Sequence, residues 1–172
     1  AYLEGMAELL RRYAWSVPSA FYASVPDVSL FDHSRSAAAL AACLADLPDD
    51  LLAHQLGKQQ HKTTPVAELI CGDLSGVQAF IYRVIARGAA KNLRGRSFYL
   101  QLLTEATARW TLRRLGLPPT NLVYAGGGRF YVLAPAGADL QDIQQEMAET
   151  LWRHHQGDLY LALGAAELTA AD

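Results

Sequence analysis

The sequence predicts an α+β domain in which an antiparallel four-stranded sheet carries its helices on one face. Between residues 66 and 163, short apolar runs typical of strands alternate with amphipathic helical stretches. The two middle runs are separated only by Gly126, Gly127 and Gly128, a pattern typical of a β-hairpin. The resulting order of elements is βα(α)ββαβ, which is the ferredoxin-like plan.

The first 65 residues are expected to lie outside this sheet. Helical spacing of apolar side chains predicts a helix over residues 2–14, and an alanine-rich run predicts a second over residues 29–44. We interpret residues 1–48 as a helical N-terminal segment leading into the sheet domain. Residues 49–65 are polar, which predicts a linker holding a short helix. The sheet domain is then predicted to span residues 66–172.

The sheet domain opens with a strand, a tight turn and a helix. An apolar run from residue 66 breaks at Gly72 and Asp73, and helical periodicity resumes at residue 77. Ser75 and Gln78 fit a capping box, in which the Ser75 hydroxyl accepts from the Gln78 amide. A carboxylate beside the free amides of a helix N-terminus suits a metal-bound polyphosphate. The alternative interpretation is a simple turn residue at Asp73 and a simple cap at Ser75.

The remaining elements follow from periodicity and stop signals. In order, the sequence predicts a helix over residues 97–115, strands over 121–125 and 129–134, a helix over 138–155 capped by Asp139, and a strand over 158–163.

The hairpin turn bears on catalysis, because this plan is also that of the palm of nucleotide cyclases and polymerases. There, carboxylates at the first strand's end and at the turn hold two metal ions against a nucleoside triphosphate. An active palm carries two acidic residues after Gly-Gly, whereas this turn reads Gly126-Gly127-Gly128-Arg129. Asp73 alone cannot hold two divalent cations, so we expect no metal site and no catalytic residue.

The turn nevertheless offers a surface for a ligand. Three glycines let the phosphates or the base of a nucleotide approach the backbone closely, beside an arginine. The alternative is that the glycines only provide the positive φ angles of a hairpin.

Basic residues gather in one part of the chain. Between Arg83 and Arg114 lie eight of the fifteen basic residues, opposed only by Glu105, although the net charge of the chain is −2. This asymmetry suggests contact with a polyanion. Arg94 and Arg96 are expected just before a helix start, where they could hold a triphosphate or an RNA backbone.

Four motifs in the same order carry a family resemblance. They are residues 28–34, 72–82, 93–100 and 124–131. Together they resemble the large subunit of type III-A, Csm-type CRISPR effector complexes, over roughly residues 15 to 164. The resemblance implies that the chain is the part of that subunit containing its first palm domain, a degenerate GGDEF-like one. A nuclease domain is expected before it, and a catalytic palm with an acidic turn after it.

The resemblance also implies a function in antiviral defence. The intact subunit would be a nucleotidyltransferase that makes cyclic oligoadenylates from ATP and a nuclease that cleaves single-stranded DNA, once target RNA is captured. This segment would be non-catalytic and would contribute an ATP-binding half-site to the palm pair, with Mg²⁺ or Mn²⁺ held mainly by the partner palm. Expected partners are other Csm-type subunits, guide RNA, target RNA and the second palm of the same chain. The residues expected to line the site are Asp73, Ser75, Arg94, Arg96, Gly126, Gly127 and Gly128.

Two other functions fit the same residues. The chain could serve as a free-standing GGDEF-like sensor, which would bind a nucleotide tightly without any complex. It could also be a purely structural scaffold, whose glycine turn serves packing alone.

Composition excludes several classes of protein. A hydrophobic content of 51% excludes disorder, and no apolar run reaches the length of a membrane span, so we expect a cytoplasmic protein. Cys43 and Cys71 have no partner at metal or redox spacing and are interpreted as buried free thiols. Asp32 and His33 lack further converging ligands, so we interpret them as a hydrogen-bonding corner.

Overall fold

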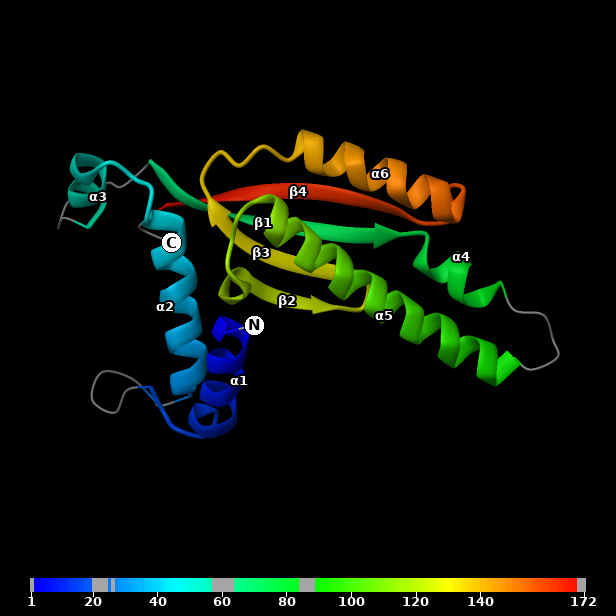
Figure 1. Cartoon of the computed structure of the whole chain (residues 1–172), viewed down its shortest axis with the longest axis horizontal. Helices are drawn as coiled ribbons and strands as arrows, with labels where there is room; N and C mark the ends of the chain where they lie inside the picture. Colours follow the sequence, from blue (N-terminus) through cyan, green and yellow to red (C-terminus); the bar gives the residue numbers. More distant parts are fainter. Residues whose placement is uncertain (1, 20–24, 26, 57–63, 84–88, 170–172) are drawn as a thin grey trace.

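The computed structural model describes residues 2–19, 25, 27–56, 64–83 and 89–169. Its elements are shown in Figure 1. In chain order they are α1 (Tyr2–Ala14), α2 (Leu30–Leu44), α3 (Asp49–Leu56), β1 (Pro65–Ser75), α4 (Val77–Tyr82), α5 (Ala89–Arg114), the 3₁₀ helix η1 (Pro119–Asn121), β2 (Leu122–Gly126), β3 (Arg129–Pro135), α6 (Gln141–His155) and β4 (Tyr160–Thr169).

The four strands form one sheet in the order β2-β3-β1-β4, and each neighbouring pair is antiparallel (Figure 1). β1 lies inside the sheet, with β3 on one side and β4 on the other. α5 and α6 pack on the same face through one shared core. This arrangement confirms the predicted α+β, ferredoxin-like fold and the helical segment before it.

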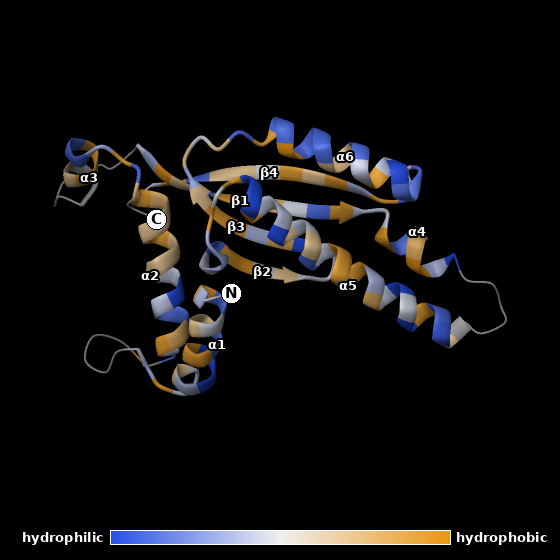
Figure 2. Cartoon of the chain, viewed as in Figure 1, coloured by the Kyte–Doolittle hydropathy of each residue, from blue (hydrophilic) through white to orange (hydrophobic). Residues whose placement is uncertain are grey.

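The main core lies between the sheet and these two helices. Ile70, Phe130 and Val132 have no solvent exposure, and burial of such side chains stabilises the fold by roughly 1.5–3 kcal/mol each. The buried residues of α6 are Ile143, Met147 and Leu151, spaced four apart, so they share one side of the helix. Figure 2 shows that α6 is otherwise mostly hydrophilic, as expected for a helix with one face on the core.

α2 packs on the opposite face of the sheet, near the start of β1. Its Ala39 and Cys43 form a second buried cluster with Ala67 and Leu133. The fully buried side chain of Asn121 joins the two parts, because its amide nitrogen donates to the carbonyl oxygen of Ala39 (3.2 Å), the Sγ of Cys43 (3.4 Å) and the carbonyl oxygen of Leu133 (2.7 Å). The helix predicted outside the sheet is therefore bonded directly to it.

The predicted corner at the start of α2 is a helix cap. The Ser29 hydroxyl accepts from the Asp32 amide at 3.0 Å and donates to the Asp32 carboxylate at 2.9 Å. Asp32 also lies 3.6 Å from the guanidinium of Arg35. These contacts give Asp32 the structural role predicted for it.

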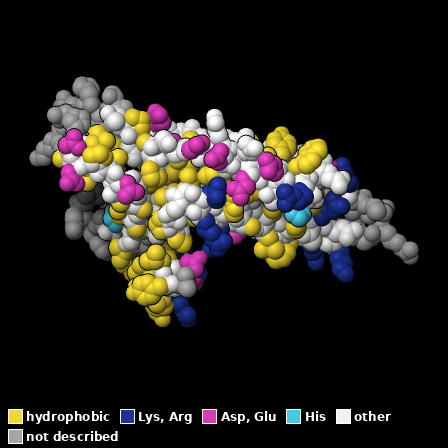
Figure 3. All heavy atoms as spheres, turned by 45° about the horizontal axis from the view of Figure 1, so that its top comes forward, with side chains coloured by type: hydrophobic (Ala, Val, Ile, Leu, Met, Phe, Trp, Pro, Cys, Tyr) yellow, Lys and Arg dark blue, Asp and Glu magenta, His cyan; other side chains and the backbone are white. Residues whose placement is uncertain are grey.

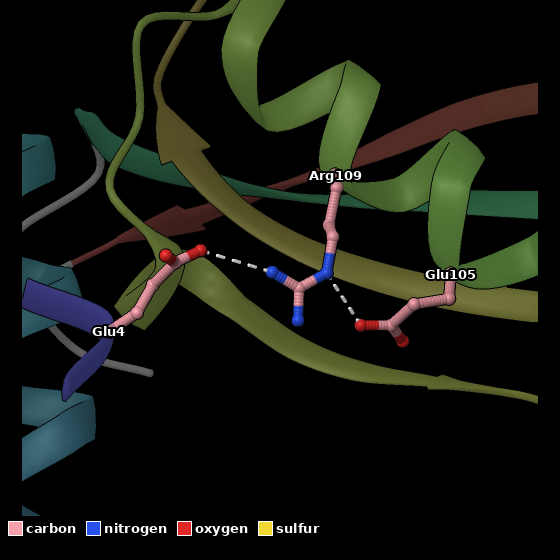
Figure 4. Close-up of polar contacts among 3 residues, drawn as sticks. All are labelled: Glu4, Glu105 and Arg109. Atoms are coloured by element: carbon pink, nitrogen blue, oxygen red, sulfur yellow. Dashed lines mark hydrogen bonds and ion pairs between the residues drawn. The ribbon is translucent and has the colours of Figure 1, made fainter. Parts of the chain in front are cut away.

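α1 is attached at the edge of the molecule. Arg109 of α5 donates to Glu105 at 2.7 Å and to Glu4 of α1 at 3.2 Å (Figure 4). Most apolar side chains of α1 are solvent exposed, and Figure 3 shows hydrophobic side chains gathered on this N-terminal helical part. The amphipathic pattern correctly predicted the helix, although most of its apolar side is uncovered in this chain.

Several predicted boundaries are wrong in informative ways. β1 continues to Ser75, α5 begins at Ala89 instead of residue 97, and β4 continues to Thr169 instead of residue 163. Residues 57–63 of the predicted linker lie outside the described residues. Within the described part of the chain, none of the helices combines the length and apolar character needed to cross a bilayer.

Candidate functional site

A cavity of about 740 Å³ lies where β1 ends, at the same sheet end as the turn between β2 and β3. The end of β1, the start of α4 and the hairpin surround it. Its walls are formed by Asp73, Leu74, Gly76, Val77, Gln78, Ala79, Tyr124, Gly126, Gly127, Arg129 and Tyr131. Asp73 and the glycine turn are expected from the sequence to line one site, and the structure places both at this end of the sheet.

Asp73 and Arg129 form an ion pair on one wall of this cavity. The two residues are direct partners in the register of β1 and β3, and the Nε of Arg129 lies 2.6 Å from the Oδ1 of Asp73. The hydroxyl of Ser75 donates to the other carboxylate oxygen of Asp73 at 3.3 Å. The hydrogen bond with Asp73 raises the pKa of Arg129, whose guanidinium is charged at neutral pH in any case.

The turn from β1 into α4 depends on glycine. Gly76 is the N-cap residue just before α4, with φ of +88°, and a Cβ there would collide with the backbone carbonyl of Asp158. Ser75 is still part of β1, and its hydroxyl donates a hydrogen bond to Asp73. The predicted capping box between Ser75 and Gln78 is therefore wrong. The extra strand residues place Ser75 on the same side of β1 as Asp73.

The hairpin turn has positive φ at both central residues, Gly127 (+62°) and Gly128 (+89°). Gly127 faces open space, whereas a Cβ on Gly128 would lie 3.3 Å from a methyl carbon of Val77. The Leu74 amide donates to the carbonyl oxygen of Gly128 at 2.7 Å, which ties the turn to β1. The turn is therefore both a hairpin connection and a fixed wall of the cavity.

Some cavity residues were not predicted. Tyr124 and Tyr131 lie on neighbouring strands with ring centroids 6.2 Å apart, and Gln78 lies on the first turn of α4. Strand alternation carries the missing signal, because Tyr131 is two residues after Arg129 and so shares its face of the sheet.

Of the seven predicted site residues, Asp73, Gly126 and Gly127 line the cavity, whereas Ser75, Gly128, Arg94 and Arg96 do not. Ser75 and Gly128 lie next to lining residues, since Ser75 donates to Asp73 and Gly128 follows Gly127 in the turn. Arg94 and Arg96 lie within α5, and not just before a helix start as predicted. Arg94 is exposed. Arg96 donates to the carbonyl oxygen of Phe80 and its guanidinium lies 5.0 Å from the centroid of the Phe80 ring, which joins α4 to α5. Their contact with a triphosphate or RNA stays a prediction.

Among the described residues, cysteine, histidine and carboxylate side chains do not converge in groups that could bind a metal. Across the described ranges, no three of them lie close enough together to hold a metal ion. Both cysteines are free thiols, as predicted. Cys43 is buried, which raises its thiol pKa to about 11, whereas Cys71 is only half-buried, so the predicted burial is confirmed for Cys43 alone.

Comparison with known proteins places the chain in a family. Residues 66–172 match the family model described as Csm1 subunit domain B. The chain belongs to the Csm1 family. This confirms the predicted resemblance to the large subunit of subtype III-A systems.

Two relatives are named as the CRISPR system single-strand-specific deoxyribonuclease Cas10/Csm1 (subtype III-A). The protein of Methanocaldococcus jannaschii is 31% identical over 98% of this chain and 24% of its own length. That of Mycobacterium tuberculosis is 38% identical over 99% of this chain and 22% of its own length. The chain thus spans about a quarter of the length of these Csm1 relatives and corresponds to one part of the large subunit.

Solved Csm1 structures share the fold. The crystal structure of a Csm1–Csm4 cassette in complex with cA3 matches 96% of this chain and 23% of its own, with a TM-score of 0.75 and 31% identity. A Csm1–Csm4 cassette in complex with one ATP matches 96% of this chain and 22% of its own, with a TM-score of 0.72 and 32% identity. Those two cassettes of Csm1 with Csm4 therefore hold cA3 and ATP, respectively.

Proposed function

We propose that this segment contributes an ATP-binding half-site to a pair of palm domains in a type III CRISPR large subunit. The pair makes cyclic oligoadenylates when target RNA is bound, and the same subunit cleaves single-stranded DNA. The observation that carries the proposal is the cavity shared by the end of β1 and the Gly126–Arg129 turn, the place where palms bind a nucleoside triphosphate.

The chemistry of the cavity suits a nucleotide. Aromatic rings at Tyr124 and Tyr131 offer flat apolar surface, and the amide of Gln78 can donate and accept hydrogen bonds. Arg129 offers a planar cation, the group best matched to phosphate oxygens. The ATP-bound and cA3-bound cassettes of related Csm1 proteins support the choice of an adenine nucleotide.

We infer a half-site because one palm supplies too few polar contacts for a triphosphate and its metal. The carboxylate that the cavity presents, Asp73, is already bonded to Arg129 and Ser75. Mg²⁺ or Mn²⁺ would therefore be held mainly by the acidic turn of the second palm, and the segment itself would be non-catalytic.

The roles of the predicted residues follow from their positions. Asp73 orients Arg129, Ser75 acts through Asp73, and Gly126 to Gly128 let the ligand approach the turn. Partners in the proposed assembly are other Csm-type subunits, the second palm, guide RNA and target RNA, in the cytoplasm. Arg94, exposed on α5, is the proposed contact for RNA backbone.

The test is to measure both activities on one variant of the intact complex with target RNA bound. Ser75→Ala removes a hydrogen bond that orients the cavity carboxylate, so oligoadenylate synthesis should fall about tenfold, while cleavage of single-stranded DNA stays near the wild-type rate. Ser36→Ala, on the exposed side of α2, is the matched control and should change neither. Unchanged synthesis in the Ser75 variant, or an equal fall of both activities, would contradict the proposal.

The isolated chain separates this proposal from a free-standing sensor. A half-site should bind ATP only weakly, with a Kd of about 1 mM or higher, and should not consume ATP with Mg²⁺ or Mn²⁺. Isothermal titration and a phosphate-release assay check these two points. Micromolar binding by the chain alone would favour the sensor, and metal-dependent ATP consumption lost in Asp73→Ala would show that the segment is catalytic.

A further inference from the structure

We infer that Arg129, held in place by Asp73, binds the phosphate groups of the nucleotide directly, at the turn where an acidic palm would hold a metal ion. The inference rests on the proposed function and names the group within that site that meets the phosphates. It assigns the segment a preference for nucleoside triphosphates over nucleosides.

The bonding pattern of Arg129 leaves its phosphate-binding edge available. A guanidinium has five N–H donors, and in Arg129 only the Nε is bonded to Asp73. The side chain is 63% exposed and lines the cavity. The four N–H groups on the two terminal nitrogens therefore face either solvent or a ligand in the cavity, and they have the fork geometry that matches two phosphate oxygens.

Asp73 makes this arrangement rigid enough to be a binding site. Its Oδ1 accepts from Arg129 and its Oδ2 accepts from Ser75, so the carboxylate is fixed from both sides. The strand register keeps the two Cα atoms opposite each other, and the Leu74 amide ties the adjoining turn to β1. Asp73 is thus a positioning residue for Arg129.

The charges of the cavity favour binding of a triphosphate over binding of a free divalent cation at Asp73. Among the residues that form its walls, Asp73 and Arg129 are the charged ones, and they compensate each other. A divalent cation bound at Asp73 would have to displace the guanidinium and would be repelled by it. A triphosphate instead meets a fixed cation, while the paired Asp73 no longer presents an uncompensated negative charge.

The experiment compares two probes, ATP and adenosine, by isothermal titration into the intact large subunit with Mg²⁺. Arg129→Ala should weaken ATP binding at one of the nucleotide sites about tenfold, because one charge-assisted contact is lost, and should leave adenosine binding unchanged. Arg129→Lys keeps the positive charge but lacks the paired N–H donors of a guanidinium, so it should lower the affinity for ATP less than Arg129→Ala does. Asp73→Asn should also weaken ATP selectively, because the guanidinium is no longer held.

Two control variants make the outcomes distinct. Arg153→Ala removes an exposed arginine of α6 on the other side of the sheet and should bind ATP like the wild type. Tyr124→Ala should weaken both probes. If Arg153→Ala lowers the affinity for ATP as much as Arg129→Ala does, the effect comes from overall charge. If Arg129→Ala lowers the affinities for ATP and adenosine equally, the role of Arg129 is structural. Either result overturns the inference.

The remaining outcomes separate the inference from the proposed function. If Tyr124→Ala weakens both probes and Arg129→Ala weakens neither, the nucleotide lies in the cavity and Arg129 does not bind its phosphates. If neither variant changes binding, the proposed function fails as well. Thermal unfolding of each variant shows whether it is folded, and the 63% exposure of Arg129 predicts an unchanged Tm.

Discussion

Side chains on one face of β1 have different surroundings at the two ends of the strand. At its start, Ala67 is covered by α2 and is 1% exposed. At its end, Asp73, on the same face by strand alternation, borders the open cavity. One strand therefore runs from a buried contact with α2 to an open cavity, and the difference arises because α2 covers only the first half of this face.

Polar groups are used differently at these two ends. At the end covered by α2, the amide of Asn121 is bonded entirely to groups inside the protein. At the open end, the Asp73–Arg129 pair is exposed, and Arg129 keeps donors available. The comparison indicates that stability should depend on the first group and ligand binding on the second, which the following predictions test.

The largest effect on stability is expected from Asn121→Ala. The substitution removes the buried donor that links Ala39 of α2 to Leu133 of β3 and leaves a void between them, which should cost roughly 2–4 kcal/mol of unfolding free energy. Urea unfolding of the chain measures it. Asn92→Ala, at an exposed position of α5, is the control and should change the free energy by less than about 0.5 kcal/mol. A similar small change in Asn121→Ala would show that α2 is held by other contacts.

Gly128→Ala should have the next largest effect. Its φ of +89° disfavours a side chain by about 1–2 kcal/mol, and the new methyl group would press on Val77. Gly127→Ala, with φ of +62° and open space around it, is the matched comparison and should cost less. The same urea titration decides between them; equal losses would mean that the turn is not packed against α4.

The two thiols should differ in reactivity and in pH dependence. Cys43 is 1% exposed and burial raises its pKa to about 11 from 9.0, so iodoacetamide at pH 8 should label Cys71 and spare Cys43 until the chain unfolds. The raised pKa means that the folded state holds the Cys43 proton more tightly. Its contribution to stability is therefore fully present below pH 9 and is lost as the pH rises from 9 through 11.

Mass spectrometry of the labelled peptides checks the reactivity, and urea midpoints between pH 8 and 11 check the sign. Rapid labelling of Cys43 in the native chain would show that α2 leaves the sheet readily. In that case the start of β1 would not be stably covered by α2, and the two ends of the strand would not differ in the way described.

The smallest effect on stability is expected from Asp73→Asn. Its ion pair with Arg129 is exposed to water, and such pairs add little to folding, so the urea midpoint should stay within the scatter of the wild type. ATP binding by the intact subunit should nevertheless fall. A clear loss of stability would assign Asp73 to the fold and weaken its assignment to the site.

The sequence was sufficient to predict the order of helices and strands along the chain and to assign Asp73 and the glycine turn to one site. Both follow from local signals, namely apolar periodicity, the three glycines and the fixed connectivity of the ferredoxin-like plan. The length of β4 could not be predicted in this way, because Gly164, Ala165 and Ala166 carry no strand signal and extend the strand only by pairing with β1.

Tertiary contacts also explain the errors at the site. The sequence predicts a helix cap at Ser75, because Ser followed by Gln three residues later is a common cap, but pairing of Ser75 with Tyr160 of β4 keeps it in the strand. The early start of α5 moved Arg94 and Arg96 into a helix, where Arg96 bonds to α4. The ion pair of Arg129 with Asp73 needed the register of β1 and β3, which the sequence does not give.

Gly72 has a consequence for how this region can change by mutation. The buried ring of Phe130 occupies the space that a side chain at position 72 would need, and the two residues are opposite each other in β1 and β3. A larger residue at position 72 is therefore tolerable only after a smaller one has replaced Phe130, and that first step would itself leave a void in the core. Either order passes through a destabilised intermediate. Single substitutions at position 72 are therefore unfavourable. Libraries of variants designed to reshape the cavity would need to vary positions 72 and 130 together.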